Sequence, residues 1–249
     1  MLELNKTHLL DCLEGIPMLD DLSIDLVVTS PPYFNSGHKY QRGTGFHYTA
    51  DIGEPLYFIY DCLELLKTKL KADGIICLNL GFSYAETGAM RPFDIVNRAR
   101  QKIGYFVNDV IIWHKPNPVP MQGRLTNAFE YIFVMSKHPI GKYYTTEYTH
   151  NVWDMPIATS GTEHSARYPE QLSDNCIKTF TKEGDLVCDP FMGSGTTGLS
   201  AIKLKRNFIG FEINPDYVKI AEGRLRDYMR QMKIIDDEIE AQGWADTEG

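Results

Sequence analysis

Two short motifs combine residue types that could act on a flat, amine-bearing ligand. The first follows the apolar, strand-like run 24–28 and reads Thr29-Ser30-Pro31-Pro32-Tyr33. Its two prolines remove backbone N–H donors and restrict the chain, so the turn presents carbonyl oxygens, the Ser30 hydroxyl and the Tyr33 ring to one small volume. Open α/β sheets bind ligands at the carboxyl ends of their strands, which is where this turn falls. A heterocycle with an exocyclic amine fits such a volume.

The second motif is a glycine loop after the strand-like run 186–188, and it reads Asp189-Pro190-Phe191-Met192-Gly193-Ser194-Gly195-Thr196. Glycines let the backbone approach a ligand, and the helix that follows offers unpaired N–H groups. The loop lacks the Lys of a phosphate-binding P-loop and the third glycine of the dinucleotide fingerprint. Glu212 ends the next strand-like run, 207–211, where a carboxylate suits ribose hydroxyls. Adenosine without a phosphate, as in S-adenosylmethionine, matches this pattern.

Strand-like and helical patterns alternate along the chain. Strand-like runs cover 26–29, 75–80, 110–113, 131–135, 186–188 and 207–211. Helical spacing of apolar residues marks 56–70, 92–103, 171–180, 197–204 and 215–229. This alternation predicts an α/β fold with a doubly wound, mostly parallel sheet. We expect one domain over 1–235, followed by a flexible acidic tail, 236–249. Two inserted loops, at about 35–53 and 115–127, contain basic residues, and the first also contains aromatic residues, a content that suits contact with DNA.

The net charge of −8 over 249 residues argues against nucleic-acid binding, because phosphate contacts need Lys and Arg. Six of the acids lie in the tail, however, which has no Lys or Arg, so the rest of the chain carries only −2. A basic face is therefore possible, and the candidate DNA contacts are Lys39, Arg42, Lys115 and Arg124. Five cysteines without paired spacing and scattered histidines predict reduced thiols and no metal site. No apolar run is long enough to predict a membrane span.

Over nearly its whole length the chain resembles the amino-methylating DNA methyltransferases, which modify cytosine N4 or adenine N6. The resemblance rests on the two motifs above and on the segments 9–13, 73–76, 112–118, 151–156, 164–169 and 209–212, with Tyr217. The proline turn precedes the glycine loop, as in the permuted beta-type members of this family. That order makes the protein-glutamine and ribosomal-RNA methyltransferases less suitable alternatives. The resemblance implies a seven-stranded sheet, parallel except for one reversed strand, of the S-adenosylmethionine-dependent methyltransferase type.

The resemblance also implies a role for each matching residue. Ser30, Pro31, Pro32 and Tyr33 would form the catalytic turn, in which the Ser30 hydroxyl and the Pro31 carbonyl accept the amino hydrogens and the Tyr33 ring stacks on the base. Asp11 would contact the adenine of S-adenosyl-L-methionine, although it could instead be a turn or cap residue. The other cofactor contacts would be Thr29, Ser30, Ser165, Tyr168, Asp189, Phe191, Gly193, Ser194, Gly195, Thr196 and Glu212.

Some of these roles can be placed more closely. Asp189 and the loop 191–196 would hold the methionine end of the cofactor, and Glu212 its ribose. Ser165 and Tyr168 fall in a segment that flanks the cofactor, where the sequence departs from the commoner His-Pro-Ala-x-Phe-Pro wording.

Within the family, Ser-Pro-Pro-Tyr is typical of cytosine-N4 enzymes, whereas Asp or Asn replaces the serine in most adenine-N6 enzymes. We therefore predict a site-specific DNA methyltransferase that acts on N4 of a flipped-out cytosine, with adenine N6 as the alternative. The expected partners are double-stranded DNA, a second copy of the chain in a homodimer, and a restriction endonuclease or separate specificity protein. The family implies a cytoplasmic, nucleoid-associated location in a prokaryote, archaeon or phage host. A non-catalytic cofactor- or nucleic-acid-binding module and an RNA or protein methyltransferase are the more distant alternatives.

Overall fold

The computed structural model describes residues 2–31, 41–42, 46–47, 57–81, 91–120, 122–123, 125–139, 143–144, 150–157 and 168–245. No helix among these residues is long and apolar enough to cross a membrane.

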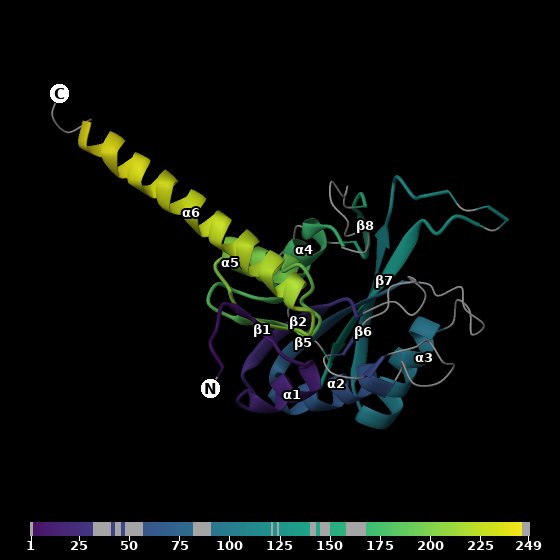
Figure 1. The fold of residues 1–249 in the computed structure, drawn as a ribbon. Coiled ribbons are helices and arrows are strands. Elements are labelled where there is room, and N and C mark those ends of the chain that lie inside the picture. Colours follow the sequence, from purple (N-terminus) through teal and green to yellow (C-terminus); the bar gives the residue numbers. More distant parts are fainter. Residues whose placement is uncertain are drawn as a thin grey trace.

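One sheet forms the centre of the described part of the chain (Figure 1). Its eight strands are β1 (Lys6–Leu9), β2 (Ile24–Thr29), β5 (Leu70–Leu80), β6 (Phe106–His114), β7 (Phe129–Ser136), β8 (Val152–Asp154), β9 (Leu186–Asp189) and β10 (Asn207–Glu212). Side by side, their order is β1-β10-β9-β2-β5-β7-β6-β8. Only β7 runs against its neighbours, β5 and β6. A separate antiparallel pair comprises β3 (Gln41–Arg42) and β4 (Phe46–His47).

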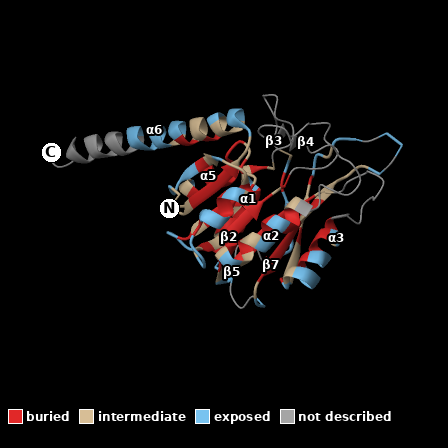
Figure 2. Cartoon of the chain, turned by 60° about the horizontal axis from the view of Figure 1, so that its bottom comes forward, coloured by how far each residue is buried: buried red, intermediate tan, exposed pale blue. Residues whose placement is uncertain are grey.

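Helices cover both faces of this sheet. They are α1 (Cys12–Gly15) with the 3-10 turn η1 (Ile16–Met18), α2 (Tyr57–Lys69), α3 (Arg91–Arg98) continued by the π-helical turn η3 (Ala99–Ile103), α4 (Glu170–Phe180), α5 (Thr196–Lys203) and α6 (Pro215–Ala245). The first three helices share one hydrophobic core with one face of the sheet, and the last three share a second core with the other face. Figure 2 shows that buried residues concentrate in the strands and on the inner sides of the helices.

The alternation of side chains along β2 explains how one strand serves both cores. Leu26 and Val28 lie in the core of α4 and α5, and Val27 lies in the core of α1 and α2. A central parallel strand is covered on both faces, so it reads as a continuous apolar run and not as an alternation. This is why the run 24–28 was recognisable in the sequence.

A topological switch point lies between β2 and β9, which are parallel neighbours. From β2 the chain crosses through α2 to β5 on one side, and from β9 it crosses through α5 to β10 on the other side. Successive crossovers that leave in opposite directions place their helices on opposite faces and open a crevice at the carboxyl ends of the two strands. The Ser30-Pro31 turn and the glycine loop begin at these two strand ends.

The predicted fold class is confirmed: the sheet is doubly wound, mostly parallel and has one reversed strand. Within the described residues it has eight strands where the resemblance implied seven. The runs that mark β1 and β8 are only four and three residues long. Such short edge strands have too few residues to show a period-two pattern, and neither was predicted from periodicity.

Helix α6 is longer than its sequence pattern predicted. It begins at Pro215, which suits a first helical position, and it runs to Ala245 instead of ending near residue 229. Residues 236–245, which we expected to be part of a flexible tail, have a helical backbone. Glu, Gln, Ala and Ile in this stretch have adequate helix propensity, and the stretch contains no proline. The far half of α6 projects from the body of the protein (Figure 1).

Candidate active site

Four strand ends bring the predicted site residues to one edge of the sheet. Leu9 at the end of β1 pairs in register with Glu212 at the end of β10, and Gly210 of β10 pairs with Asp189 of β9. Val27 of β2 pairs with Cys188 of β9, so the end of β2 at Thr29 lies beside Asp189, and the chain leaves the sheet at Ser30. Sequence positions that are up to 203 residues apart, Leu9 and Glu212, thereby meet, because parallel strands end at a common edge.

Asp189 is the centre of a buried hydrogen-bond network. Its side chain is 1% exposed. The Thr29 hydroxyl donates to Oδ1 at 2.7 Å, the Phe191 N–H donates to the same oxygen at 3.0 Å, and the Thr197 hydroxyl donates to Oδ2 at 2.5 Å. The Thr29 contact joins the strand of the proline turn directly to the start of the glycine loop. The described ends of the two motifs, Thr29 and Asp189, are therefore linked by a direct hydrogen bond.

Tyr168 extends this network toward the segment before α4. Its hydroxyl bonds to the Thr197 hydroxyl and lies 3.4 Å from Asp189 Oδ2. Since Thr197 already gives its proton to Asp189, Tyr168 is the donor to Thr197 Oγ1. Burial, followed by the nearby Asp189 carboxylate, raises the pKa of the Tyr168 phenol well above its ordinary value. Thr197 was absent from the predicted site, although its position directly after the Gly-Ser-Gly-Thr sequence was a signal that could have revealed it.

The glycine loop is tied to Glu212 through backbone donors. Gly193 N–H donates to one Glu212 oxygen at 2.8 Å, and Asn214 N–H donates to the other at 2.8 Å. Burial raises the pKa of this carboxyl, as it does for Asp189, even though the hydrogen-bond donors around each group favour the charged form. Two partly or fully buried carboxyl groups thus lie at either end of the loop.

The loop itself has the features of a ligand cradle. Gly193 and Gly195 have φ of +53° and +83°, so the backbone turns sharply before α5 begins. Gly195 occupies the N-cap position of α5 without a side-chain cap bond. The Ser194 hydroxyl is buried and has no hydrogen-bond partner within the described part of the chain. Unpaired helix N–H groups, a partnerless hydroxyl and the Glu212 carboxylate fit a ligand with hydroxyl and charged groups.

We expect Gly195→Ala to destabilise the protein by more than about 2 kcal/mol and to abolish cofactor binding. A Cβ at this position would adopt an unfavourable left-handed backbone and would lie 2.7 Å from the Ala221 Cβ. Gly184→Ala is the matched control, because Gly184 has φ of +86° but no atom within 4 Å of an added Cβ. Thermal unfolding and cofactor titration of both variants check this. Equal losses of stability and of cofactor affinity in the two variants would contradict a role for the Ala221 contact.

Asp11 lies next to this edge, directly after β1. The Leu10 N–H donates to the Glu212 carbonyl at 3.0 Å, which places Asp11 beside the end of β10. Its carboxylate caps α1 by accepting the Leu13 N–H at 2.9 Å. The helix-cap alternative is therefore confirmed as a structural role, and a contact with the adenine of a cofactor stays a prediction.

The predicted DNA contacts are only partly described. Lys115 is 9% exposed, its ammonium group forms an ion pair with Glu130 at 2.6 Å, and it also lies over the Trp113 ring. A DNA contact by Lys115 stays a prediction and would require this buried pair to open. Arg42 belongs to β3, where only the backbone is described. Pro32, Tyr33, Lys39, Arg124 and Ser165 lie outside the described residues.

Known proteins with this sequence pattern are DNA methylases. A family model described as DNA methylase, N6_N4_Mtase, matches residues 24–223. The chain is 28% identical over 262 residues to the Type II methyltransferase M.SmaI of Serratia marcescens, covering 86% of this chain and 88% of that protein. It is 30% identical over 248 residues to the Type II methyltransferase M.HinfI of Haemophilus influenzae, covering 87% of this chain and 67% of that protein.

Solved structures with the same fold agree. The PvuII DNA methyltransferase (cytosine-N4-specific) has a TM-score of 0.75 and 25% identity, covering 87% of this chain and 84% of that chain. The Thermus thermophilus protein TTHA0409, complexed with S-adenosyl-L-methionine, has a TM-score of 0.68 and 26% identity, covering 88% and 93%. These matches indicate that the cofactor is S-adenosyl-L-methionine, and its contacts with the loop and Glu212 stay a prediction.

Proposed function

Because this chain belongs to the DNA methylase family of N4- and N6-amino-methyltransferases, we propose that it moves the methyl group of S-adenosyl-L-methionine to the exocyclic N4 of cytosine in DNA. The observation that carries the proposal is the bond between Thr29 and Asp189, 2.7 Å long. It joins the end of β2, which Ser30 and Pro31 follow, to the loop suited to the cofactor. A base amine at the turn and a methyl donor at the loop would then face one another in the same crevice.

Bound S-adenosyl-L-methionine supplies a methyl group on a positively charged sulfur. The chemical task left to the protein is to make the amine nucleophilic, since its lone pair is delocalised into the base. The Ser30 hydroxyl and the Pro31 carbonyl can accept the amino hydrogens, which draws the nitrogen toward pyramidal geometry and stabilises the charge that develops on it. Transfer would form the N–C bond as the S–C bond breaks with its electron pair left on sulfur, and the proton that the methylated nitrogen then loses would pass to solvent.

The base must first leave the duplex, which costs a few kcal/mol. Stacking on the Tyr33 ring would offset about 1 to 3 kcal/mol of that cost. Lys39, Arg42, Lys115 and Arg124 are the proposed contacts to the DNA around it.

We propose cytosine and not adenine as the target base because the first residue of the proline turn is a serine, Ser30. The Ser-Pro-Pro-Tyr turn resembles that of cytosine-N4 enzymes, and the PvuII enzyme, described as cytosine-N4-specific, has a similar fold. Either amine would satisfy the same two acceptors, so N6 of adenine is the second candidate.

Nucleoside mass spectrometry tests the proposal. Mixed-sequence DNA is incubated with the protein and with S-adenosylmethionine that carries an isotopically labelled methyl group. Labelled N4-methylcytosine is the expected product. Labelled N6-methyladenine would keep the mechanism and reverse the base preference, and no labelled nucleoside, with label retained after all DNA is removed, would favour an RNA or protein substrate.

We further propose that the chain acts as a homodimer and that it works with a restriction endonuclease or a specificity partner. The span between β7 and α4 is short for a separate recognition domain, which leaves a small surface for reading a DNA sequence. Two copies would enlarge that surface. Light scattering with DNA bound is expected to give the mass of two chains per complex, and the mass of a single chain would count against the dimer.

A further inference from the structure

The back of the glycine loop rests on α6. Ala221 of α6 is fully buried, and the only residue that fits against it at the end of the loop is a glycine, Gly195, because an added Cβ would lie 2.9 Å from the Ala221 Cα. Arg224 follows three residues later and so lies on the same side of the helix. The loop is therefore backed by a helix that begins after the next strand, β10.

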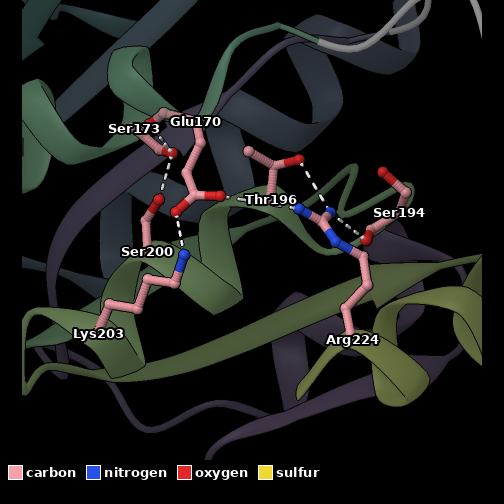
Figure 3. Close-up of polar contacts among 7 residues, drawn as sticks. All are labelled: Glu170, Ser173, Ser194, Thr196, Ser200, Lys203 and Arg224. Carbon is pink, nitrogen blue, oxygen red and sulfur yellow. Dashed lines mark hydrogen bonds and ion pairs between the residues drawn. The ribbon is translucent and has the colours of Figure 1, made fainter. Parts of the chain in front are cut away.

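The Arg224 guanidinium reaches from α6 into this loop (Figure 3). Its Nη1 donates to the Ser194 carbonyl at 2.7 Å and to the Thr196 hydroxyl at 3.2 Å. Its Nη2 lies 4.0 Å from a carboxylate oxygen of Glu170, the first residue of α4. A planar guanidinium with five donors can hold such partners at one time, whereas the single ammonium group of a lysine cannot present the same fork.

The glycine loop needs surrounding groups such as Arg224 to hold its shape. Two glycines with left-handed φ precede α5, and the N-cap residue, Gly195, has no side chain with which to cap the helix. Glycines gain the most freedom when a loop loosens, so a loop of this kind holds its shape only if surrounding groups restrain it. Arg224 restrains it on both sides of Gly195, at Ser194 and at Thr196.

We propose that Arg224 is a positioning residue for cofactor binding, holding the Ser194–Thr196 backbone in the shape that receives S-adenosyl-L-methionine while Glu170 orients its guanidinium. This inference depends on the family's cofactor and on the loop as its site, but not on which base is methylated. Arg224 acts through the loop and touches no reacting atom. Glu170, the first residue of α4, is thereby linked to the cofactor loop through its ion pair with Arg224.

Lys203 supplies a matched control. It lies in the last turn of α5 and also forms an ion pair with Glu170, but within the described part of the chain it makes no hydrogen bond or ion pair with the loop (Figure 3). Its ammonium group further lies 5.6 Å from the centre of the Tyr228 ring. Lys203→Met therefore removes a cation from the same carboxylate and leaves the Arg224 contacts with the loop in place.

Calorimetric titration of the full chain with S-adenosyl-L-methionine, without DNA, tests the proposal. We expect Arg224→Met to raise the dissociation constant about 10- to 100-fold, because two charge-assisted hydrogen bonds to the loop are lost. Arg224→Lys, which keeps the charge and one donor direction, is expected to recover part of the affinity. Lys203→Met is expected to stay within about twofold of the wild type. At saturating cofactor, kcat on DNA in Arg224→Met is expected within about threefold of the wild type, so that the loss appears in KM for the cofactor.

Several outcomes would overturn the proposal. Wild-type affinity in Arg224→Met would show that the loop does not depend on the guanidinium. An equal loss in Lys203→Met would assign the effect to packing of α4, α5 and α6 around Glu170. Thermal unfolding of each variant separates a general loss of stability from a loss of affinity. If Arg224→Met does not fold, wild-type affinity in Arg224→Lys would show that the forked donors of the guanidinium are not needed. A wild-type chain that bound no cofactor would instead refute the proposed function.

Discussion

Ser30→Ala is expected to lower methyl transfer to DNA by about 10²- to 10³-fold while leaving the affinity for S-adenosyl-L-methionine largely unchanged. The substitution removes the hydroxyl that would accept an amino hydrogen of the base, an interaction that strengthens as positive charge develops on the nitrogen. It leaves the Thr29 bond to Asp189 in place, so the cofactor loop keeps its anchor on β2. The loss should therefore appear in kcat and kcat/KM for DNA and not in the cofactor dissociation constant.

Ser23→Ala is the matched control for this experiment. Ser23 precedes the same strand at its opposite end, and its hydroxyl donates to the Asp20 carbonyl at 2.7 Å. Wild-type activity is expected there. Tyr33→Ala should also abolish most methyl transfer and leave cofactor affinity intact. Tyr33→Phe should retain methyl transfer because the ring that stacks on the base remains. If Ser30→Ala weakened cofactor binding and left turnover intact, the assignment of the proline turn to the base would be wrong.

Glu212→Ala is expected to weaken cofactor binding about 100-fold or more. The variant loses the carboxylate proposed for the ribose hydroxyls, and it also removes the acceptor that holds the Gly193 and Asn214 N–H groups. Two contributions from one side chain explain why the effect should exceed that of a single ribose contact. Titration with S-adenosyl-L-methionine measures it, with Glu183→Gln as a control at the opposite end of β9, where the side chain pairs with Lys205 at 3.6 Å in solvent.

The pH dependence of binding should report the same residue. Burial raises the pKa of Glu212 above the ordinary range of a glutamate in the cofactor-free protein. The ionised form accepts hydroxyl hydrogens and attracts a cationic ligand, so affinity should rise with pH through the raised pKa and level off above it. The sign for stability is opposite. Between the ordinary and the raised pKa the folded chain binds more protons than the unfolded chain, so the stability of the cofactor-free protein falls as pH rises through that window.

Glu212→Gln should remove the part of this dependence that comes from Glu212, leaving the part from Asp189, whose pKa is raised in the same direction. Cofactor affinity measured between about pH 5 and pH 8 tests the predicted rise of affinity with pH. Thermal unfolding over the same range tests the predicted fall of stability. Wild-type affinity that was independent of pH, or that fell as pH rose, would exclude the ionised carboxylate as the binding form.

The sequence by itself determined which strand ends meet at the proposed site. The run 24–28 and the run 186–188 are buried central strands, and such strands are recognisable because both of their faces are apolar. The residues after these two runs, and Glu212 at the end of the run 207–211, had to lie at a carboxyl edge, which is why Ser30, Asp189 and Glu212 could be chosen before any contact was known. Glycines in the loop were informative for the same local reason, since they mark backbone that other residues adopt with strain.

Only the tertiary structure decided which of these residues touch. Thr29 and Asp189 are 160 positions apart and meet because β2 and β9 are neighbours. Arg224 reaches Ser194 because α6 packs with one particular side against the loop. Lys115, a predicted DNA contact, pairs with Glu130, which the register of β6 and β7 places opposite Trp113, two residues before Lys115. Strand adjacency, register and helix rotation depend on the packing of the whole core, and a local pattern of residues does not contain them.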